Sequence, residues 1–334
     1  MRVAVLGDIN IDVAVGVETM PGPGEEVFAT SSRIGLGGSG LNTAVVLTHL
    51  GLTTTILAQV GDDPFGRFAL SELDAIGIDT SRLITTPRHT TGLNLVTVTS
   101  DGERSMIGAR GANPAYANGH PEVGDWLHVS GYTFLGGQQR NAARAALDWG
   151  KKHGVPISMD IPAGVGARIG PDLAQHLPGC RLVSGGLASL AAIAPATDPV
   201  AALLGLGVER VAVTAGAGPC RLTVTGTTVT VTPPTVASVD STGAGDSFIA
   251  GLIAADLCGL DPGPALTVAA ALGAAAVTHR GAGASLGDAA RVEAVLERWD
   301  DRSAWLEEAS RFLDTRLSGG RRASSEVGLA EPAE

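Results

Sequence analysis

The feature that most constrains the fold of this chain is a regular alternation of strand-like and helix-like segments from position 125 onward. Short apolar runs predict buried strands at 126–130, 155–160, 180–184 and 209–214. Helices are expected among them at 139–152, 170–177, 188–193 and 198–205. This alternation predicts a mostly parallel central sheet flanked by helices, with ligands bound at the carboxyl ends of the strands.

The rest of the chain extends this scheme at both ends. Before position 80, strands are predicted at 2–7 and 53–60 and helices at 40–50 and 65–76. After position 215, the sequence predicts a hairpin at 220–232 and helices at 245–257, 264–279 and 288–314. Residues 318–334 are polar and irregular, and we expect them to form a disordered tail.

Two segments interrupt the α/β scheme. Residues 11–33 and 90–110 alternate polar and apolar side chains, which is typical of half-exposed strands, and Asp101-Gly102 predicts a hairpin turn. We expect these segments to form one small antiparallel β-sheet, a lid over a core built from residues 1–10, 34–89 and 111–315. An apolar surface on this lid predicts a homodimer formed through it, and its expected members are Val13, Val15, Val27, Leu95 and Val98.

Composition and charge exclude several classes of function. Hydrophobic residues make up 44% of the chain and charged residues 17%, a balance typical of globular enzymes and not of disordered proteins. The net charge of −11 and the lack of a basic run before the tail argue against a nucleic-acid partner. An apolar run of about 18 residues, as a membrane span needs, is absent from the sequence. Three widely spaced cysteines, Cys180, Cys220 and Cys258, predict reduced thiols in a cytoplasmic protein.

The strongest chemical motif is the nine-residue segment that runs from Asp240 to Phe248, DSTGAGDSF. Gly243, Ala244 and Gly245 are small enough for the backbone to approach a ligand closely, and they open a predicted helix. The unpaired N–H groups of that first turn and the helix dipole would form an anion hole for a transferring phosphoryl group. Asp246 lies at the same helix start, where its carboxylate could accept the proton of a substrate hydroxyl.

This motif closely resembles the signature of the ribokinase-like (PfkB-type) carbohydrate kinase family. Further segments resemble the family in the same order along about residues 1–300. They are GDINID at 7–12, GGSGLNTA at 37–44, VGDDPFG at 60–66 and RGAN at 110–113. The resemblance implies ATP-dependent phosphorylation of a hydroxyl of a sugar-like small molecule, with Mg²⁺ accompanying the ATP.

The resemblance also implies roles for individual residues. Asp246 would be the catalytic base, and the backbone of Gly243, Ala244 and Gly245 would be the anion hole. The expected substrate-binding residues are Asn10, Asp12, Gly38 and Asn42. Thr214 and Gly216 would lie beside the ATP phosphates together with Gly243 and Gly245. Six positions match a monovalent-cation site of ribokinase, which would take K⁺: Asp240, Thr242, Ala276, His279, Gly281 and Ser285. An ordinary loop explains these six residues equally well.

Three departures from the family pattern bear on the function. An Asn-x-x-Glu motif that helps organise Mg²⁺ is missing from the segment 182–188, where the sequence is LVSGGLA. Pro219 stands where a glycine is usual. The segment 128–132 lacks the glutamate that ribokinase uses for ribose, so the sequence does not predict ribose as the substrate.

Three alternatives stay open. A nucleoside kinase shares the fold, but aromatic residues that could stack on a base are few: Phe28, Tyr116, Tyr132 and Phe134. A catalytically weak sugar-binding or regulatory protein on the same scaffold would explain the missing Glu. An NAD-dependent dehydrogenase would explain the Gly-x-Gly-x-x-Gly pattern at Gly35–Gly40, with Asp62 22 residues beyond it. The segment before that pattern is polar on alternate positions, which is unlike the buried strand of a dinucleotide-binding unit.

Overall fold

The computed structural model describes all 334 residues except 101–103, 123, 171–172, 300–302 and 325–334. A nine-stranded sheet runs through the centre in the order β13-β12-β11-β10-β9-β8-β1-β4-β5. Its strands are β1 (Arg2–Leu6), β4 (Thr53–Gly61), β5 (Leu83–Thr86), β8 (Trp126–Ser130), β9 (Ile157–Ile161), β10 (Leu182–Gly186), β11 (Arg210–Thr214), β12 (Cys220–Val224) and β13 (Thr227–Val231). Every pairing from β11 to β5 is parallel, and only the β11–β12 and β12–β13 pairings are antiparallel. The predicted α/β class is confirmed.

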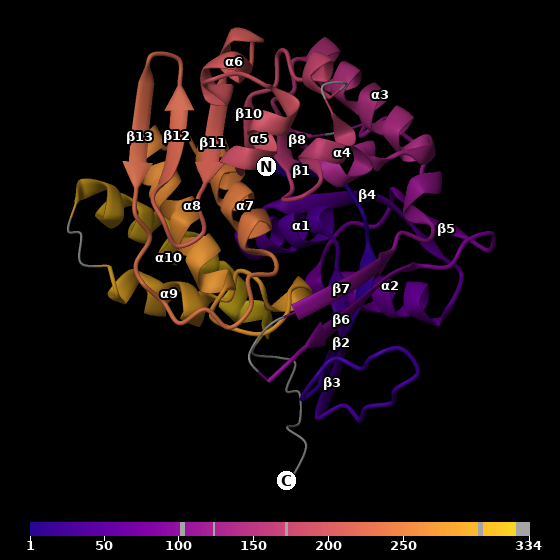
Figure 1. Ribbon diagram of the computed structural model, residues 1–334. Coiled ribbons are helices and arrows are strands. Elements are labelled where there is room, and N and C mark those ends of the chain that lie inside the picture. Colours follow the sequence, from indigo (N-terminus) through magenta and orange to yellow (C-terminus); the bar gives the residue numbers. More distant parts are fainter. Residues whose placement is uncertain (101–103, 123, 171–172, 300–302, 325–334) are drawn as a thin grey trace.

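Helices cover both faces of this sheet (Figure 1). One face carries α1 (Ser39–His49), α2 (Pro64–Ile76), α7 (Ala244–Leu257), α8 (Pro262–Ala276), α9 (Ala289–Glu297) and α10 (Ala304–Ser324). The other face carries α3 (Gly137–His153), α4 (Gly166–Ile169), α5 (Leu187–Ile193) and α6 (Pro199–Gly205). In β1, Val3 and Val5 point to the first core and Ala4 and Leu6 to the second, as the two-residue period of a strand requires. Because β1 is buried on both faces, it is apolar at every position from Val3 to Leu6.

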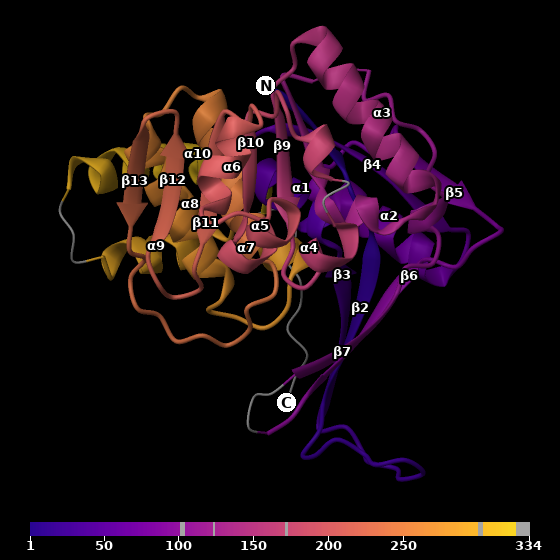
Figure 2. The ribbon, with the colours of Figure 1, turned by 45° about the horizontal axis from the view of Figure 1, so that its top comes forward.

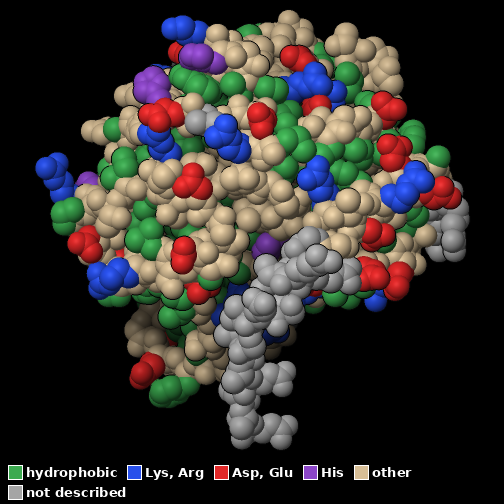
Figure 3. Space-filling model, turned by 180° about the vertical axis from the view of Figure 1, so that it is seen from behind, with side chains coloured by type: hydrophobic (Ala, Val, Ile, Leu, Met, Phe, Trp, Pro, Cys, Tyr) green, Lys and Arg blue, Asp and Glu red, His purple; other side chains and the backbone are tan. Residues whose placement is uncertain are grey.

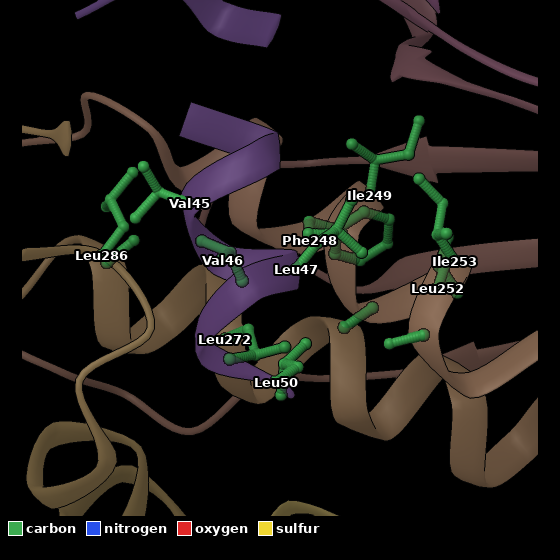
Figure 4. Packing of buried hydrophobic residues seen from close by; sticks show 14 of the residues in the cluster. Val45, Val46, Leu47, Leu50, Phe248, Ile249, Leu252, Ile253, Leu272 and Leu286 are labelled. Atoms are coloured by element: carbon green, nitrogen blue, oxygen red, sulfur yellow. The ribbon is translucent and has the colours of Figure 1, made fainter. Parts of the chain in front are cut away.

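The helices α7 and α8 are buried almost all round, because their residues are apolar on every side. Glycine lets them approach closely: a Cβ on Gly251 of α7 would lie 2.9 Å from the Ala269 Cα atom of α8. Figure 4 shows α1 packed into the same core. The labelled side chains there are Val45, Val46 and Leu47 of α1, Leu50 just after it, Phe248, Ile249, Leu252 and Ile253 of α7, and the neighbouring Leu272 and Leu286.

A second, four-stranded sheet projects from the carboxyl ends of the central strands (Figure 2). Its order is β3-β2-β6-β7, from β2 (Asn10–Gly16), β3 (Ser31–Gly37), β6 (Gly92–Val98) and β7 (Arg104–Ala109). These are the two segments expected to form the lid. The outer pairings are antiparallel, whereas the central β2–β6 pairing is parallel. The reason is that β2 and β6 both leave the core at its edge and run outward side by side.

The apolar surface expected on the lid is distributed differently. Val13, Val15 and Leu95 share the outer face, and the register adds Ile34 opposite Val13 and Ile107 opposite Leu95. Ile34, Leu95 and Ile107 are exposed. Val98 pairs with Gly16 and therefore points to the opposite face, and Val27 lies outside the strands. A homodimer through the outer face stays a prediction.

Three local expectations differ from the structure. The predicted helix at 170–177 is instead the short α4 and a 3₁₀ turn at Ala174–His176, because Gly170 adopts a left-handed φ of 60° that ends α4. The single helix expected at 288–314 is two helices, α9 and α10. Helix α10 continues to Ser324, past position 318 where we expected the tail to begin. The predicted Asp101-Gly102 turn lies outside the described residues.

The surface carries charges of both signs. On the face seen in Figure 3, Lys and Arg side chains are interspersed with Asp and Glu and do not gather into one basic patch. Within the part of the chain that the structure describes, no helix combines the length and the apolar character needed to cross a membrane.

Candidate active site

The start of α7 is the chemical centre of the molecule. Gly243 precedes the helix with a left-handed φ of 80°, a conformation that glycine adopts without strain, and a Cβ there would lie 2.7 Å from a Leu286 methyl group. Ala244, Gly245 and Asp246 form the first helical turn. Their backbone N–H groups point out of the helix end, as an anion hole requires.

The carboxyl of Asp246 is held between α7 and α1. Its Oδ2 atom accepts a hydrogen bond from Asn42 Nδ2 at 2.7 Å, and its Oδ1 atom lies 2.8 Å from the Ser39 hydroxyl. Burial raises the pKa of Asp246 to about 7, and the negative charge of Asp160 adds to the increase, although the bonds from Asn42 and Ser39 act in the opposite direction. A carboxyl with such a pKa can accept a proton at neutral pH and release it again.

Asn42 has both ends of its side chain engaged. Its Nδ2 atom donates to Asp246, and its Oδ1 atom accepts a hydrogen bond from the Gly283 N–H at 3.1 Å. The sequence predicted a substrate contact for this residue, and the structure adds a direct contact with the expected base. Asn42 therefore orients Asp246 as well as bordering the site.

The other substrate-binding candidates lie where the lid joins the core. Asn10 Oδ1 accepts a hydrogen bond from Asn113 Nδ2 at 2.9 Å, and Asp12 Oδ1 accepts one from Asn94 Nδ2 at 2.8 Å. Burial raises the pKa of Asp12. Gly38 has a φ of 110°, and a Cβ there would lie 2.2 Å from the Asp8 carbonyl oxygen. These side chains form a polar floor of amide and carboxylate groups, which suits the hydroxyls of a small polyol.

Asp8, in contrast, is a structural residue. Its two carboxylate oxygens each lie 3.0 Å from a nitrogen of the Arg110 guanidinium, and Gln139 Nε2 donates to Oδ1 at 2.7 Å. The pair ties the start of the lid at Asp8 to its end at Arg110. A buried carboxylate held by a two-pronged guanidinium has little capacity left for a ligand.

Three of the four residues expected to bind ATP, all but Gly243, line one cavity of about 310 Å³ beside the α7 start. Thr214 and Gly216 form one wall and Gly245 another, while Val236, Phe248 and Val277 make the cavity largely apolar. Such a cavity suits a flat, mostly apolar base. Because Ser241, Ala244 and Gly245 belong to its lining, phosphates attached to that base would point at the anion hole.

The six residues of the expected cation site lie in the loops on either side of α7 and α8. Asp240 accepts hydrogen bonds from the Thr242 N–H at 2.9 Å and the Gly281 N–H at 2.8 Å. His279 Nε2 and the Ser285 hydroxyl are 2.7 Å apart, and Ala276 ends α8. Burial and the nearby charges of Arg291 and Arg33 lower the pKa of His279. Because N–H groups already bind Asp240 and guanidinium groups lie near, these residues fit a cation poorly, and K⁺ dependence stays a prediction.

The described residues contain no group of three or more His, Cys, Asp or Glu side chains placed to hold a metal ion, so they offer magnesium no complete set of protein ligands. The segment that would carry Asn-x-x-Glu is the end of β10 and the start of α5, with Gly185 and Gly186 at the turn. Magnesium ions keep several waters and bind largely through substrate phosphates, so this chain fits a metal that arrives on ATP.

Sequence reasoning missed Ser39, His128 and Asp160 as members of the site. Asp160 lies near the carboxyl end of β9 and is 8% exposed, with Oδ2 3.0 Å from the Ser39 hydroxyl. The available signal was an acid at the carboxyl end of a buried parallel strand, where α/β proteins bind ligands. The dehydrogenase alternative is wrong, because Gly35 and Gly37 belong to β3, an edge strand of the lid and not part of the parallel sheet.

Comparisons with known proteins agree with this geometry. The model of the pfkB family carbohydrate kinases matches residues 1–289. An ATP-dependent ribose-1-phosphate kinase of Halopiger xanaduensis is 29% identical over 84% of this chain and 94% of its own length. A ribokinase of Haemophilus influenzae is 27% identical over 84% of this chain and 94% of its own length. The structure of Arabidopsis thaliana ribokinase with ribose and ATP superimposes with a TM-score of 0.72 at 24% identity, covering 88% of this chain and 98% of that one. The chain therefore belongs to the pfkB family of carbohydrate kinases, and it is a phosphotransferase with an alcohol group as acceptor.

Proposed function

We propose that this enzyme transfers the γ-phosphoryl group of ATP to a hydroxyl of an uncharged sugar or sugar-like molecule, with Asp246 as the general base. The observation that carries the proposal is the place of Asp246. It lies at the start of α7, with the apolar cavity on one side and the polar floor of Asn10 and Asp12 on the other. A hydroxyl on that floor and a phosphate from that cavity would meet at this carboxyl.

Each part of the site then has a role in the transfer. The polar floor binds the substrate hydroxyls, and Asp246 accepts the proton of the attacking one. The N–H groups at Gly243–Gly245 stabilise the charge on the transferring group, and Mg²⁺ bound to ATP neutralises the phosphates. Three carboxyl groups lie near the proposed acceptor position, those of Asp12, Asp160 and Asp246. Because their negative charge would repel a phosphate, they favour an uncharged substrate over a sugar phosphate.

The structure bears on the two remaining alternatives. Tyr116 and Phe134 are buried, which leaves Phe28 and Tyr132 as the aromatic candidates for stacking on a nucleoside base. That favours a sugar. A catalytically weak binding protein would need no base, whereas Asp246 is held by two hydrogen bonds with a pKa suited to proton transfer.

A panel assay tests the proposal. ATP consumption with Mg²⁺ is measured over neutral sugars, polyols, nucleosides and sugar 1-phosphates, with each reaction repeated in the Asp246→Asn variant as the control. We expect turnover with one or more neutral sugars that the variant lacks. Turnover with nucleosides alone would establish the nucleoside kinase. Binding of a sugar without any turnover would establish the binding protein.

A further inference from the structure

Two carboxyl groups from distant parts of the chain share one serine in the active site. The Ser39 hydroxyl oxygen lies 3.0 Å from Asp160 Oδ2 and 2.8 Å from Asp246 Oδ1. The hydroxyl of Ser130 donates to the same oxygen at 3.3 Å.

Counting hydrogens shows that this arrangement needs an extra proton. A serine hydroxyl has one hydrogen, and an ionised carboxylate can only accept. If both Asp160 and Asp246 were ionised, Ser39 could donate to one of them and its oxygen would face the lone pairs of the other. The two short contacts are both hydrogen bonds only when one carboxyl is protonated and donates to Ser39.

Asp160 has polar neighbours besides Ser39. Its Oδ1 atom accepts from the Gly131 N–H at 3.2 Å and lies 3.5 Å from Nε2 of the fully buried His128. That Nε2 atom has no hydrogen-bond partner among the described residues.

The tautomer of His128 follows from its other neighbours. Trp126 Nε1, which can only donate, lies 2.8 Å from the Ser158 hydroxyl, so Ser158 accepts there. The Ser158 hydrogen is then free to point at His128 Nδ1, 3.0 Å away. In that arrangement the ring hydrogen of His128 lies on Nε2, 3.5 Å from Asp160 Oδ1.

We propose that Asp160 is a positioning residue that acts through Ser39 on the proton of Asp246. The negative charge of Asp160 favours a proton on Asp246. Asp246 must release that proton to solvent before it can accept the proton of a substrate hydroxyl, so Asp160 sets the pH above which the base is ready to act. This inference rests on the proposed role of Asp246 as the base.

The other charged groups around the two carboxyls come from several elements. Asp12 of β2 adds to the negative charge felt by Asp246, and Arg33 of β3 acts on Asp12. Tyr132 faces both carboxyls, and burial together with the charges of Asp160 and Asp246 raises its pKa to about 12, so it stays neutral. Arg110 near Tyr132 is bound to Asp8. Of these, Asp160 has the largest effect on Asp246 after burial.

The pH dependence of kcat/KM tests the inference, measured at saturating MgATP with the substrate found in the panel. In the wild type the acidic limb should lie near pH 7. In Asp160→Asn the amide can donate to Ser39 and carries no charge, so the limb should move to lower pH by roughly one unit. In Ser39→Ala the protonated base loses the hydroxyl that accepts its hydrogen bond and connects it to Asp160, so the limb should also move to lower pH. Asp74→Asn, on the exposed face of α2, is the matched charge control and should leave the limb unchanged.

Shifts to lower pH in both variants would support the inference. A uniform loss of kcat/KM with an unmoved limb in Asp160→Asn would show a purely structural role and overturn it. If that variant does not fold, Ser39→Ala decides, and a limb that stays or moves to higher pH overturns the inference. An inactive Asp246→Asn beside an unshifted Asp160→Asn would refute this inference alone. Wild-type turnover in Asp246→Asn would refute the base assignment and the inference together.

Discussion

The junction of α1 with α7 and the lid sheet border the same site, but they are built in opposite ways. At the junction, Asn42 and Ser39 reach Asp246 from a helix whose residues 40–47 are all buried. In the lid, each strand has one face toward the site, and Ile34, Leu95 and Ile107 stay exposed on the other. Packing fixes a side chain, whereas a sheet with little core of its own is free to move. From this difference we expect the chemistry to take place at the junction and the lid to enclose the substrate.

The largest effect is expected from Asp246→Asn, which removes the expected base from the junction and leaves the lid unchanged. Loss of the base should lower kcat by about a hundredfold or more with little change in substrate affinity, because the amide keeps the shape of the side chain. Steady-state kinetics and a binding titration measure the two effects. Turnover within a few-fold of the wild type would remove Asp246 from the role of base.

The variants Asn42→Ala, at the junction, and Asp12→Ala, in the lid, should change different kinetic constants. Asn42 touches Asp246, so its loss should lower kcat, whereas Asp12 lies on the lid strand β2 and its loss should raise the KM for the acceptor. Each lost contact should cost about 1–3 kcal/mol, and the KM for ATP should change little in either variant. A change confined to the KM for ATP would mean that the two ligands are assigned to the wrong sides of the site.

Asp246 at the junction should also make the stability of the folded protein depend on pH. The folded-state pKa of Asp246 lies above its unfolded value, so the protein binds more protons when folded and loses stability as pH rises from about 4 through about 7. Asp246→Asn removes this titration. The variant should therefore melt at a higher temperature than the wild type at pH 8 and show a smaller advantage at pH 5. Equal pH dependence of the two melting temperatures would contradict the raised pKa.

The smallest effect is expected in the lid. Substrate binding should slow amide hydrogen exchange together in 11–33 and 90–110, because a closed lid excludes water from the transferring group. The buried strand β1 serves as the internal control and should not change. Overlapping exchange profiles with and without substrate would mean that the lid does not close.

Local sequence was sufficient to predict the α/β class and to single out Asp246 as the expected base. Strand and helix periods depend on neighbouring residues, and the Gly243–Asp246 turn lies within four consecutive positions, so both can be recognised along the chain. The two wrong helix predictions have a related cause, because a single position can end a helix while the apolar periodicity on either side stays the same. At 170–177 that position is a glycine, and within 288–314 the chain leaves one helix and begins another.

Only the tertiary structure determined how distant segments meet. The serine that joins the two carboxyls is 121 positions from Asp160 and 207 from Asp246. The parallel β2–β6 pairing joins Asp12 to Asn94, 82 positions away, although the sequence predicted one small antiparallel sheet from the two segments. Such contacts depend on where the whole sheet places the ends of its strands. The polar and apolar periodicity of one segment carries no information about which distant segment will pair with it. The sequence therefore determined which residue is the expected base, and the tertiary structure decided which distant groups act on its proton.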